Sequence, residues 1–309
     1  MIYSCLSYPG AKRKVINELL EVMPDGIEDW REPFFGGGSV SIGFLQSDKA
    51  KDCKRFIVGD LYSEVWAFWV AIQKNPKLVE QYVNEYFYKF CTTHDRAAVL
   101  DPRAEEFEHV YEQAIAEGKK FWDWSQLDDT VKNMDLYQRA ARFYIVNHVS
   151  FSSMSDSGSL SKDGFMGFSP KKFSNVYDVS KVIQRLEILN APFQTTMANT
   201  TEGSFVFLDP PYIAQEKSGL YGKKGSTHKG FPHQELADMC KGLNCKWLMT
   251  IDDSIAARKL YDGCMIEKFF IQYTMAGKRA EDALAGEELL ISNYKVYEDD
   301  TFDDLDDLI

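Results

Sequence analysis

The stretch SFVFLDPPY, residues 204–212, sets the fold class of the chain. Its first half is a run of aromatic and aliphatic residues, which predicts a short buried strand. The run stops at Asp209, and the two prolines that follow have no N–H group with which to extend a strand. Open α/β sheets bind their ligands beyond the carboxyl ends of their strands. Asp209 and Tyr212 are therefore predicted to face a ligand site.

The residues at this strand end share a chemical character. The Asp209 carboxylate and the backbone carbonyl of Pro210 can only accept hydrogen bonds, while Tyr212 offers a flat aromatic face. This combination suits a planar molecule that carries an –NH2 group, because both amine hydrogens can be held while the ring stacks on the tyrosine. The nitrogen lone pair then points out of the ring plane, toward an electrophile. The alternative is an ordinary Asp-Pro-Pro turn, which the aromatic residue disfavours.

Segments on both sides of this strand alternate between helix and strand. Before it, we predict helices over 12–23, 39–47 and 63–73, the last capped by Ser63, and strands over 30–35 and 55–61. After it, we predict strands over 245–251, 264–275 and 287–297, and helices over 233–243 and 254–263. The pattern predicts an α/β sheet with helices on both faces.

The middle of the chain, residues 76–189, has a different character. It is polar, aromatic and mainly helical, and it contains a Ser/Gly-rich loop without apolar periodicity. We therefore predict a discontinuous catalytic domain, residues 1–75 and 190–297, interrupted by a mainly helical insertion, residues 76–189. The acidic tail, residues 298–309, is predicted to be disordered.

The net charge of −12 by itself disfavours a polyanionic partner. Seven of the acidic residues lie in the tail, and without them the charge is −12 + 7 = −5. The tail is interpreted as a solubilising segment, or alternatively as one that competes with DNA or binds a partner. The charge therefore neither supports nor excludes nucleic acid.

Other features narrow the class of protein further. No apolar run approaches the length that spans a bilayer, and the first residues lack the pattern of a signal peptide. The six cysteines form no CxxC pair and have no histidine-rich partner spacing. Reduced thiols in a cytoplasmic protein are therefore expected, and no metal site is predicted.

Three consecutive glycines, Gly36 to Gly38, separate a predicted strand from a predicted helix. Glycines permit a tight turn and let a ligand approach the backbone beside the free N–H groups of a helix start. Asp60 ends the next strand, where an acidic residue of a Rossmann-like unit usually binds a ribose. A structural turn and a helix-capping aspartate are the alternatives. No GK[ST] follows the glycines, so a nucleoside-containing cofactor is favoured over a P-loop.

Three motifs together resemble one known family. They are SYPGAK at 7–12, FFGGGS at 34–39 and DPPY at 209–212, and in this order they span most of the chain. The chain resembles the Dam-type (D12 class) adenine-specific DNA N6-methyltransferases, which use S-adenosylmethionine and no metal. The resemblance implies a Rossmann-like class I methyltransferase sheet, in which the helical insertion recognises the target. Relatives that methylate protein glutamine have asparagine where Asp209 stands.

The resemblance also implies roles for the residues of these motifs. Tyr8 stands where many relatives have tryptophan. The residues assigned to the cofactor are Tyr8 and Lys12 at its border, Phe34, Gly36 and Gly38 at its methionine part, Asp60 at its ribose, and Asp209. The catalytic residues assigned to the target base are Asp209, Pro210, Pro211 and Tyr212.

A run in the insertion, residues 143–153, resembles the Asn-Arg-x-x-Phe-Asn-Gly segment with which the family holds DNA. It matches at Asn147 and Phe151 and departs at His148, Ser152 and Ser153, which affects the expected target sequence. Phosphate contacts are expected from basic residues in three loops. The residues assigned to them are Lys162, Lys171, Lys223, Lys224, Lys229, Lys278 and Arg279.

The function expected from these observations is methylation of adenine N6 in double-stranded DNA, at a GATC-like site by analogy, in a bacterial or phage-infected cell. Cytosine N4 is an alternative target, because it presents an amine to the same tetrapeptide. A catalytically silent DNA-binding or DNA-mimicking relative is a second alternative, which the intact Asp209 and Tyr212 disfavour. A monomer or a weak dimer on DNA is expected.

Overall fold

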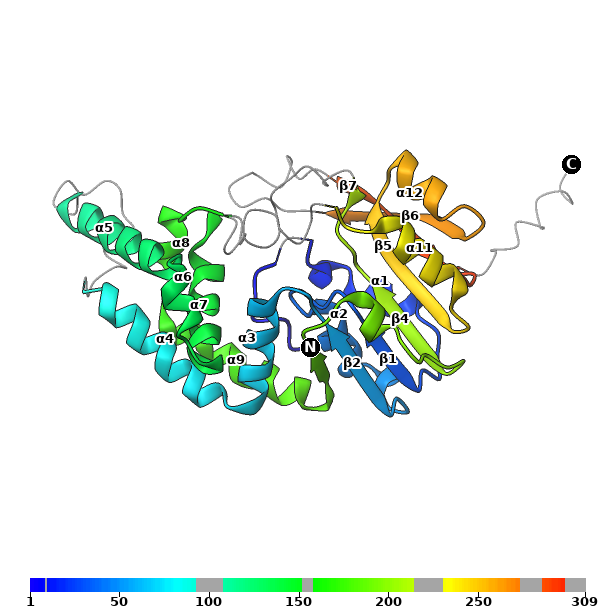
Figure 1. Cartoon of the computed structure of the whole chain (residues 1–309), viewed down its shortest axis with the longest axis horizontal. Coiled ribbons are helices and arrows are strands. Elements are labelled where there is room, and N and C mark those ends of the chain that lie inside the picture. Colours follow the sequence, from blue (N-terminus) through cyan, green and yellow to red (C-terminus); the bar gives the residue numbers. More distant parts are fainter. Residues whose placement is uncertain (9, 93–107, 152–157, 214–229, 273–284, 298–309) are drawn as a thin grey trace, which may run out of the picture.

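The computed structural model describes residues 1–8, 10–92, 108–151, 158–213, 230–272 and 285–297. Within them a seven-stranded sheet has the order β3-β2-β1-β4-β5-β7-β6. The strands are β1 (Asp29–Glu32), β2 (Arg55–Gly59), β3 (Glu187–Leu189), β4 (Ser204–Leu208), β5 (Lys246–Asp252), β6 (Met265–Gln272) and β7 (Ala285–Ser292). All neighbours pair in parallel except at β7, which runs antiparallel to both β5 and β6. This is the predicted Rossmann-like sheet (Figure 1).

Strand β4 lies at the centre of the sheet, between β1 and β5. All five of its residues are buried, as expected for a parallel strand that is covered on both faces. Phe205 and Phe207 pack into one hydrophobic cluster, and Val206 and Leu208 into a second one on the opposite face. Asp209 follows directly, so it lies at the carboxyl edge of the sheet.

Helices cover both faces of the sheet (Figure 1). On the face of Phe205 lie α1 (Ile16–Val22), α2 (Ser39–Leu45) and α3 (Ser63–Lys74). The opposite face carries α10 (Phe193–Thr196), α11 (His233–Gly242) and α12 (Ile255–Leu260). Among the described helices, none combines the length and the apolar character that crossing a bilayer requires.

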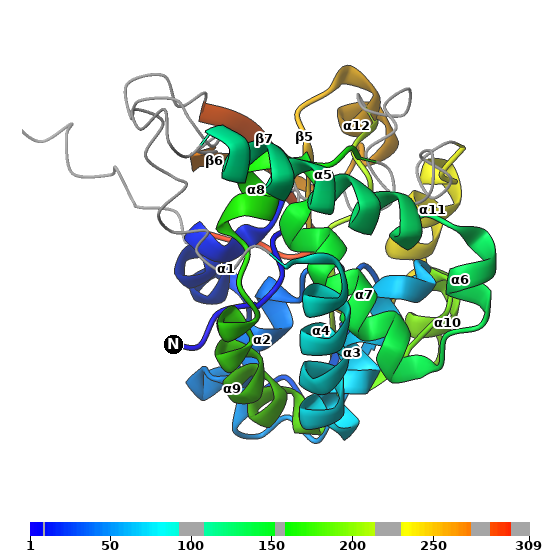
Figure 2. The same cartoon turned by 90° about the vertical axis from the view of Figure 1, so that its left-hand side faces the viewer.

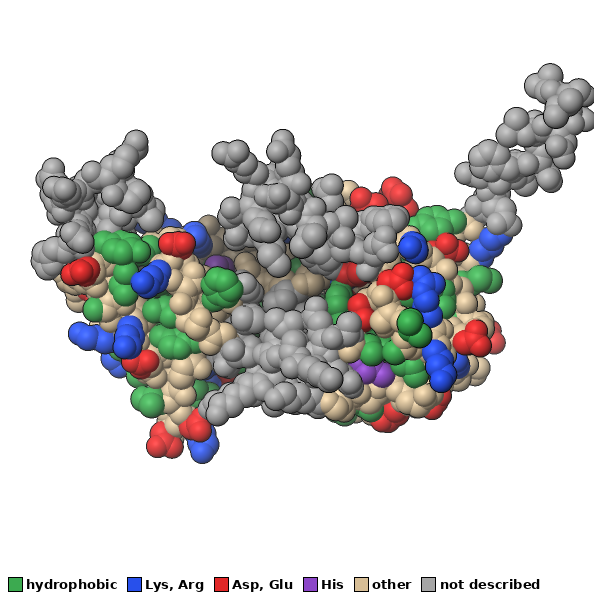
Figure 3. Space-filling view, turned by 90° about the horizontal axis from the view of Figure 1, so that it is seen from above, with side chains coloured by type: hydrophobic (Ala, Val, Ile, Leu, Met, Phe, Trp, Pro, Cys, Tyr) green, Lys and Arg blue, Asp and Glu red, His purple; other side chains and the backbone are tan. Residues whose placement is uncertain are grey.

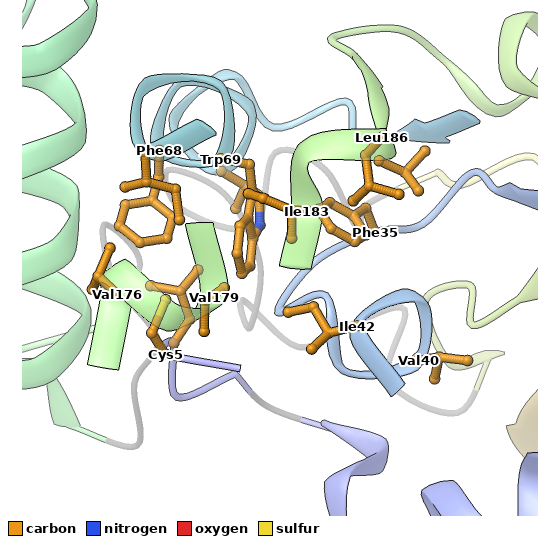
Figure 4. Packing of buried hydrophobic residues seen from close by; sticks show 14 of the residues in the cluster. Cys5, Phe35, Val40, Ile42, Phe68, Trp69, Val176, Val179, Ile183 and Leu186 are labelled. Atoms are coloured by element: carbon orange, nitrogen blue, oxygen red, sulfur yellow. The ribbon is translucent and has the colours of Figure 1, made fainter. Parts of the chain in front are cut away.

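The remaining helices form a second layer against α3. They are α4 (Pro76–Phe90), α5 (Glu108–Ser125), α6 (Asp128–Lys132), α7 (Leu136–Val149), α8 (Lys162–Gly167) and α9 (Ser174–Val182). Helices α3, α4 and α7 lie side by side (Figure 2). The Phe68 ring of α3 stacks on Tyr144 of α7, with ring centroids 5.9 Å apart. Val176 and Val179 of α9 pack beside Phe68, in the same cluster as the sheet residues (Figure 4).

Several local expectations need correction. The helix predicted over 12–23 is split into a 3-10 turn, η1 (Lys12–Lys14), and α1. Ser63 does not cap α3: it is the first residue of the helix, and Tyr62 occupies the N-cap position. The Ser63 hydroxyl accepts a hydrogen bond from Arg139 on α7. Strand β3 joins the sheet at Glu187, three residues before the expected boundary at residue 190. The division into a catalytic domain and an insertion remains a prediction.

Candidate active site

A pocket with a volume of about 240 Å³ opens at the carboxyl ends of β1, β2 and β4. It brings together the residues that the sequence assigned to a cofactor and to a target amine. These are Tyr8, Lys12, Phe34, Gly36, Gly38, Asp60, Asp209, Pro210, Pro211 and Tyr212. The segments that carry them include residues as far apart in the sequence as Tyr8 and Tyr212. Their individual roles remain predictions.

The glycine turn follows β1 and leads into α2, as predicted. Gly36 and Gly38 have positive φ angles of 43° and 70°, a region that favours glycine. A Cβ atom on Gly36 or Gly37 would come within 2.8 or 2.7 Å of the Tyr8 side chain, which lies against the turn. The turn therefore needs glycine both for its conformation and for the close approach of Tyr8.

Asp60 lies just beyond β2 and is held by backbone groups. One carboxylate oxygen accepts a hydrogen bond from the Gly36 N–H and the other from the Tyr62 N–H, each at 2.8 Å. Burial raises the pKa of Asp60 to about 6, although these two hydrogen bonds favour the charged form. Each oxygen keeps a lone pair, so Asp60 can accept further hydrogen bonds from a ligand that enters the pocket.

Asp209 is held by side chains instead. The Lys12 ammonium donates to both carboxylate oxygens, at 2.8 and 3.0 Å, and the Thr250 hydroxyl donates to one of them at 2.9 Å. The side chain of Lys12 is only 1% exposed, whereas that of Asp209 is 23% exposed. Asp209 therefore faces the pocket with a buried positive charge behind it.

Glu288 on β7 is a site residue that sequence reasoning missed. It is buried, it accepts a hydrogen bond from the Tyr212 hydroxyl, and one of its oxygens lies 3.5 Å from the Lys12 nitrogen. Burial raises the pKa of Glu288, and the Lys12 charge opposes this shift. The only hint in the sequence was a glutamate within the apolar run ELLIS. Which residues this side chain contacts depends on the strand order, which the sequence did not reveal.

Glu32, the last residue of β1, was also missed. It is buried and accepts hydrogen bonds from the N–H and the hydroxyl of Ser41 on α2. Burial raises the pKa of Glu32 to about 8, and the neighbouring Asp209 charge adds to the shift. A carboxylate at the end of a buried strand is the rule that singled out Asp209, and the same rule applies to Glu32.

Three aromatic rings form an apolar wall of the pocket. Phe34, Phe193 and Phe231 have ring centroids 5.6–5.9 Å apart. Only Phe34 was assigned from the sequence, because Phe193 and Phe231 belong to segments without a motif. A wall of this kind can hold a flat ring by stacking.

The sequence matches the family model of the D12 class N6 adenine-specific DNA methyltransferases over residues 8–275. The chain belongs to this family. The assignment chooses adenine N6 over cytosine N4, which the tetrapeptide alone left open. Members of a methyltransferase family of this class use S-adenosylmethionine as methyl donor and DNA as substrate, so both expectations hold at the level of the family.

Three curated relatives match this methyltransferase over 93%, 94% and 72% of its length. It is 23% identical to the type II methyltransferase M1.LlaDCHI of Lactococcus lactis subsp. cremoris, over 93% of this chain and 94% of the relative. It is 24% identical to the type II methyltransferase M.MjaIII of Methanocaldococcus jannaschii, over 94% of this chain and 98% of the relative. A third match, 23% identical, is to the modification methylase StsI of Streptococcus sanguinis, of which it covers 31%.

Asn147, which was expected to contact DNA, is buried in this methyltransferase. Its amide donates to the Ser7 carbonyl at 2.7 Å and accepts from the Ser7 N–H at 3.1 Å. In the structure, Asn147 thus fixes the N-terminal segment, which continues through Tyr8 to Lys12, against helix α7. Its expected contact with DNA remains a prediction.

The other residues assigned to DNA fall into two groups. Phe151, Lys162 and Lys171 are exposed, which leaves them accessible to a large ligand. Basic and acidic side chains are interspersed on the face in Figure 3, so the described residues form no single basic patch there. The remaining assigned residues lie outside the described part of the chain, as does the acidic tail 298–309. They are Lys223, Lys224, Lys229, Lys278 and Arg279.

No group of three or more His, Cys, Asp or Glu side chains that could hold a metal ion occurs among the residues that the structure describes. All six cysteines are described, and no disulfide bond joins any of them.

Proposed function

We propose that this methyltransferase binds S-adenosylmethionine across the glycine turn and Asp60, and presents the methyl group to an adenine N6 held at Asp209. The observation that carries the proposal is the shared pocket. It places a side-chain-free turn, a fixed carboxylate and the DPPY residues around one volume.

The residues at the glycine turn fit such a cofactor. The glycine turn lines the pocket, and Tyr8, which packs on Gly36 and Gly37, borders it. Asp60 can accept hydrogen bonds from a pair of ribose hydroxyls, because backbone N–H groups already fix its orientation. The cofactor supplies an electrophilic methyl group on a positively charged sulfur.

The residues at the other end of the pocket fit a target adenine. Asp209 and the Pro210 carbonyl would accept the two N6 hydrogens, and Tyr212 would lie against the base. An adenine inside a duplex cannot reach Asp209, so the base must be flipped out at a cost of a few kcal/mol. Stacking on an aromatic ring returns about 1–3 kcal/mol of this cost.

The reaction needs orientation more than a strong base. The cofactor, held at the glycine turn and Asp60, would supply its methyl group to the N6 lone pair and keep the electron pair of its C–S bond on sulfur. The nitrogen then loses a proton, and Asp209 is the acceptor, directly or through a water molecule. Asp209 first acts by holding the amine hydrogens, which keeps the lone pair directed at the methyl carbon.

The test is transfer of labelled methyl to DNA by Asp209→Ala, followed by nucleoside analysis of the product. We expect no transfer above background, no N6-methyladenine, and a melting temperature close to that of the wild type. Asp262→Ala, which changes an exposed aspartate outside the pocket, should keep full activity. Transfer by Asp209→Ala at the wild-type rate would remove Asp209 from the mechanism.

We also propose a GATC-like target, which rests on family resemblance alone. Sequencing that detects modified adenine in DNA from cells expressing the protein would identify the target. Methylation confined to sites without GATC would refute this part and leave the chemistry of the pocket unaffected.

A further inference from the structure

Two carboxylates, not one, share the buried ammonium of Lys12. Its nitrogen lies 2.8 Å from Asp209 and 3.5 Å from Glu288, and Glu288 is only 2% exposed. The Tyr212 hydroxyl joins the cluster, because it lies 3.2 Å from the Lys12 nitrogen and donates to Glu288. The cluster thus connects β7 to the catalytic tetrapeptide.

The sheet geometry explains why Glu288 meets these residues. In the antiparallel pair of β5 and β7, Glu288 lies opposite Asp252, at the carboxyl end of β5. Side chains alternate along a strand, so Glu288 shares a face with Leu290, which packs in the cluster of Phe207. Asp209 continues the same face two residues after Phe207. Lys12 therefore meets both carboxylates on one side of the sheet.

Burying a second carboxylate in this position costs free energy, which suggests that it has a functional role. Burial raises the pKa of Glu288, and the Asp209 charge raises it further, while Lys12 opposes both effects. An apolar residue of similar size would avoid this cost and pack against the same cluster. Because Glu288 lies next to both Lys12 and Tyr212, we look for its functional role in the placement of these two side chains.

The hydrogen bonds of Asp209 pose a problem for the target amine. One of its oxygens accepts from Lys12 and Thr250, and the other accepts from Lys12. One lone pair of Asp209 remains, on the oxygen that accepts only from Lys12, so an amine hydrogen that binds there shares this oxygen with the ammonium. Glu288, which does not line the pocket, offers the ammonium an alternative acceptor 3.5 Å away, a distance that a small rotation of the lysine side chain would close.

We propose that Glu288 is a positioning residue for methyl transfer: it receives the Lys12 ammonium when the target amine occupies Asp209, and it holds the Tyr212 ring through its hydroxyl. The inference rests on the proposed placement of the adenine amine at Asp209. It assigns to β7 a part in catalysis that no motif in the sequence indicated.

The first test is Glu288→Gln, because glutamine keeps the size of the side chain and still accepts from Tyr212 but cannot attract the ammonium. We expect kcat to fall by about tenfold or more, while KM for DNA and Kd for S-adenosylmethionine stay within about twofold. Glu288→Asp, which keeps the charge, should recover part of kcat. The matched control is Glu267→Gln, an exposed glutamate on the adjacent strand β6.

The second test is Tyr212→Phe, alone and combined with Glu288→Leu, because leucine, unlike glutamine, cannot accept a hydrogen bond from the Tyr212 hydroxyl. Tyr212→Phe alone keeps the aromatic ring and the charges of the cluster but removes the hydrogen bond to Glu288. Its result does not depend on how well Glu288→Gln folds. We expect the combined loss in kcat to be smaller than the product of the single losses, because the two side chains share one contact.

The outcomes separate the inference from the function on which it rests. A kcat for Glu288→Gln within about twofold of the wild type, or losses that multiply fully in the double variant, would overturn the role of Glu288 while Asp209→Ala remains inactive. A Glu288→Gln variant that loses thermal stability but keeps kcat in its folded fraction would also overturn it. Activity in Asp209→Ala would refute the proposed function itself.

Discussion

The two ends of the pocket hold their carboxylates in different ways. At the glycine-turn end, Asp60 accepts from the N–H groups of Gly36 and Tyr62. At the amine end, Asp209 accepts from the side chains of Lys12 and Thr250. Backbone N–H groups cannot turn away without unfolding the turn, whereas a lysine ammonium can move to another acceptor.

This difference matches what each end is proposed to bind. A ribose that donates hydroxyl hydrogens can add to a carboxylate that keeps free lone pairs, so the glycine-turn end can be fixed in advance. A target amine must share an oxygen of Asp209 with the Lys12 ammonium, so the amine end benefits from a donor that can move to another acceptor. Changes at the amine end should therefore mainly lower kcat, and changes at the glycine-turn end should mainly weaken cofactor binding.

The largest effect is expected for Lys12→Met. The substitution leaves Asp209 and Glu288 close together without a cation, and breaking a buried ion pair in this way typically costs about 3–5 kcal/mol of stability. We expect kcat to fall by about 10²–10³-fold, measured as single-turnover methyl transfer at saturating cofactor. Lys14→Met, at an exposed lysine of the same turn, is the control. A kcat near that of the wild type would show that Asp209 needs no cation.

Asn147→Ala probes the segment that joins the two ends. It removes both hydrogen bonds to the Ser7 backbone and leaves buried groups without those partners. We expect a loss of about 2–4 kcal/mol in the free energy of unfolding, measured by urea denaturation. Affinity for DNA should stay unchanged in the folded protein. Weaker DNA binding at unchanged stability would support the prediction that Asn147 contacts DNA. The control is Asn133→Ala, which changes an exposed asparagine.

Asp60→Asn should affect the glycine-turn end alone. The amide nitrogen cannot accept, so one of the two backbone N–H groups loses its acceptor and the ribose site loses its charge. We expect Kd for S-adenosylmethionine to rise by about tenfold, measured by calorimetry, while kcat at saturating cofactor changes little. A lower kcat with unchanged Kd would mean that the glycine-turn end affects methyl transfer itself and not only cofactor binding.

The smallest effect is expected for Glu32→Gln, and it depends on pH. Because the pKa of Glu32 is raised from 4.5 to about 8, the folded protein holds a proton there that the unfolded chain has lost. The stabilisation is complete below pH 4.5 and is lost as the pH rises to about 8. Between pH 6 and 7.5, the free energy of unfolding of the wild type should fall relative to the variant by up to about 1.4 kcal/mol per pH unit.

Urea denaturation at both pH values measures this difference. Glu28→Gln, which changes an exposed glutamate before β1, should run parallel to the wild type across the same range. Parallel curves for Glu32→Gln would show that Glu32 is ionised in the folded protein throughout.

The parts of the site that follow directly from a strand end were predictable from the sequence. Asp209, the glycine turn and Asp60 each lie within a few residues of a buried strand, and the sheet brings such ends together. Glu288 was not predictable, because its meeting with Lys12 requires β7 to insert between β5 and β6. The hydrogen bonds of Asn147 depend on how α7 packs against the N-terminal segment. The apolar pattern of a helix predicts which positions are buried but not which residues they contact.

The shared hydrophobic core has a consequence for changing the target sequence of this enzyme. Residues of α3, α7 and α9 pack in the same cluster as the central strand, and Asn147 ties α7 to the segment that carries Lys12. The helical segment 76–189 therefore cannot be replaced without changing contacts in the core of the protein. A chimera that takes residues 76–189, the predicted recognition segment, from a relative would have to match the α3 interface and supply an amide for Ser7. Otherwise its methyl-transfer site would be damaged, whatever DNA sequence the segment binds.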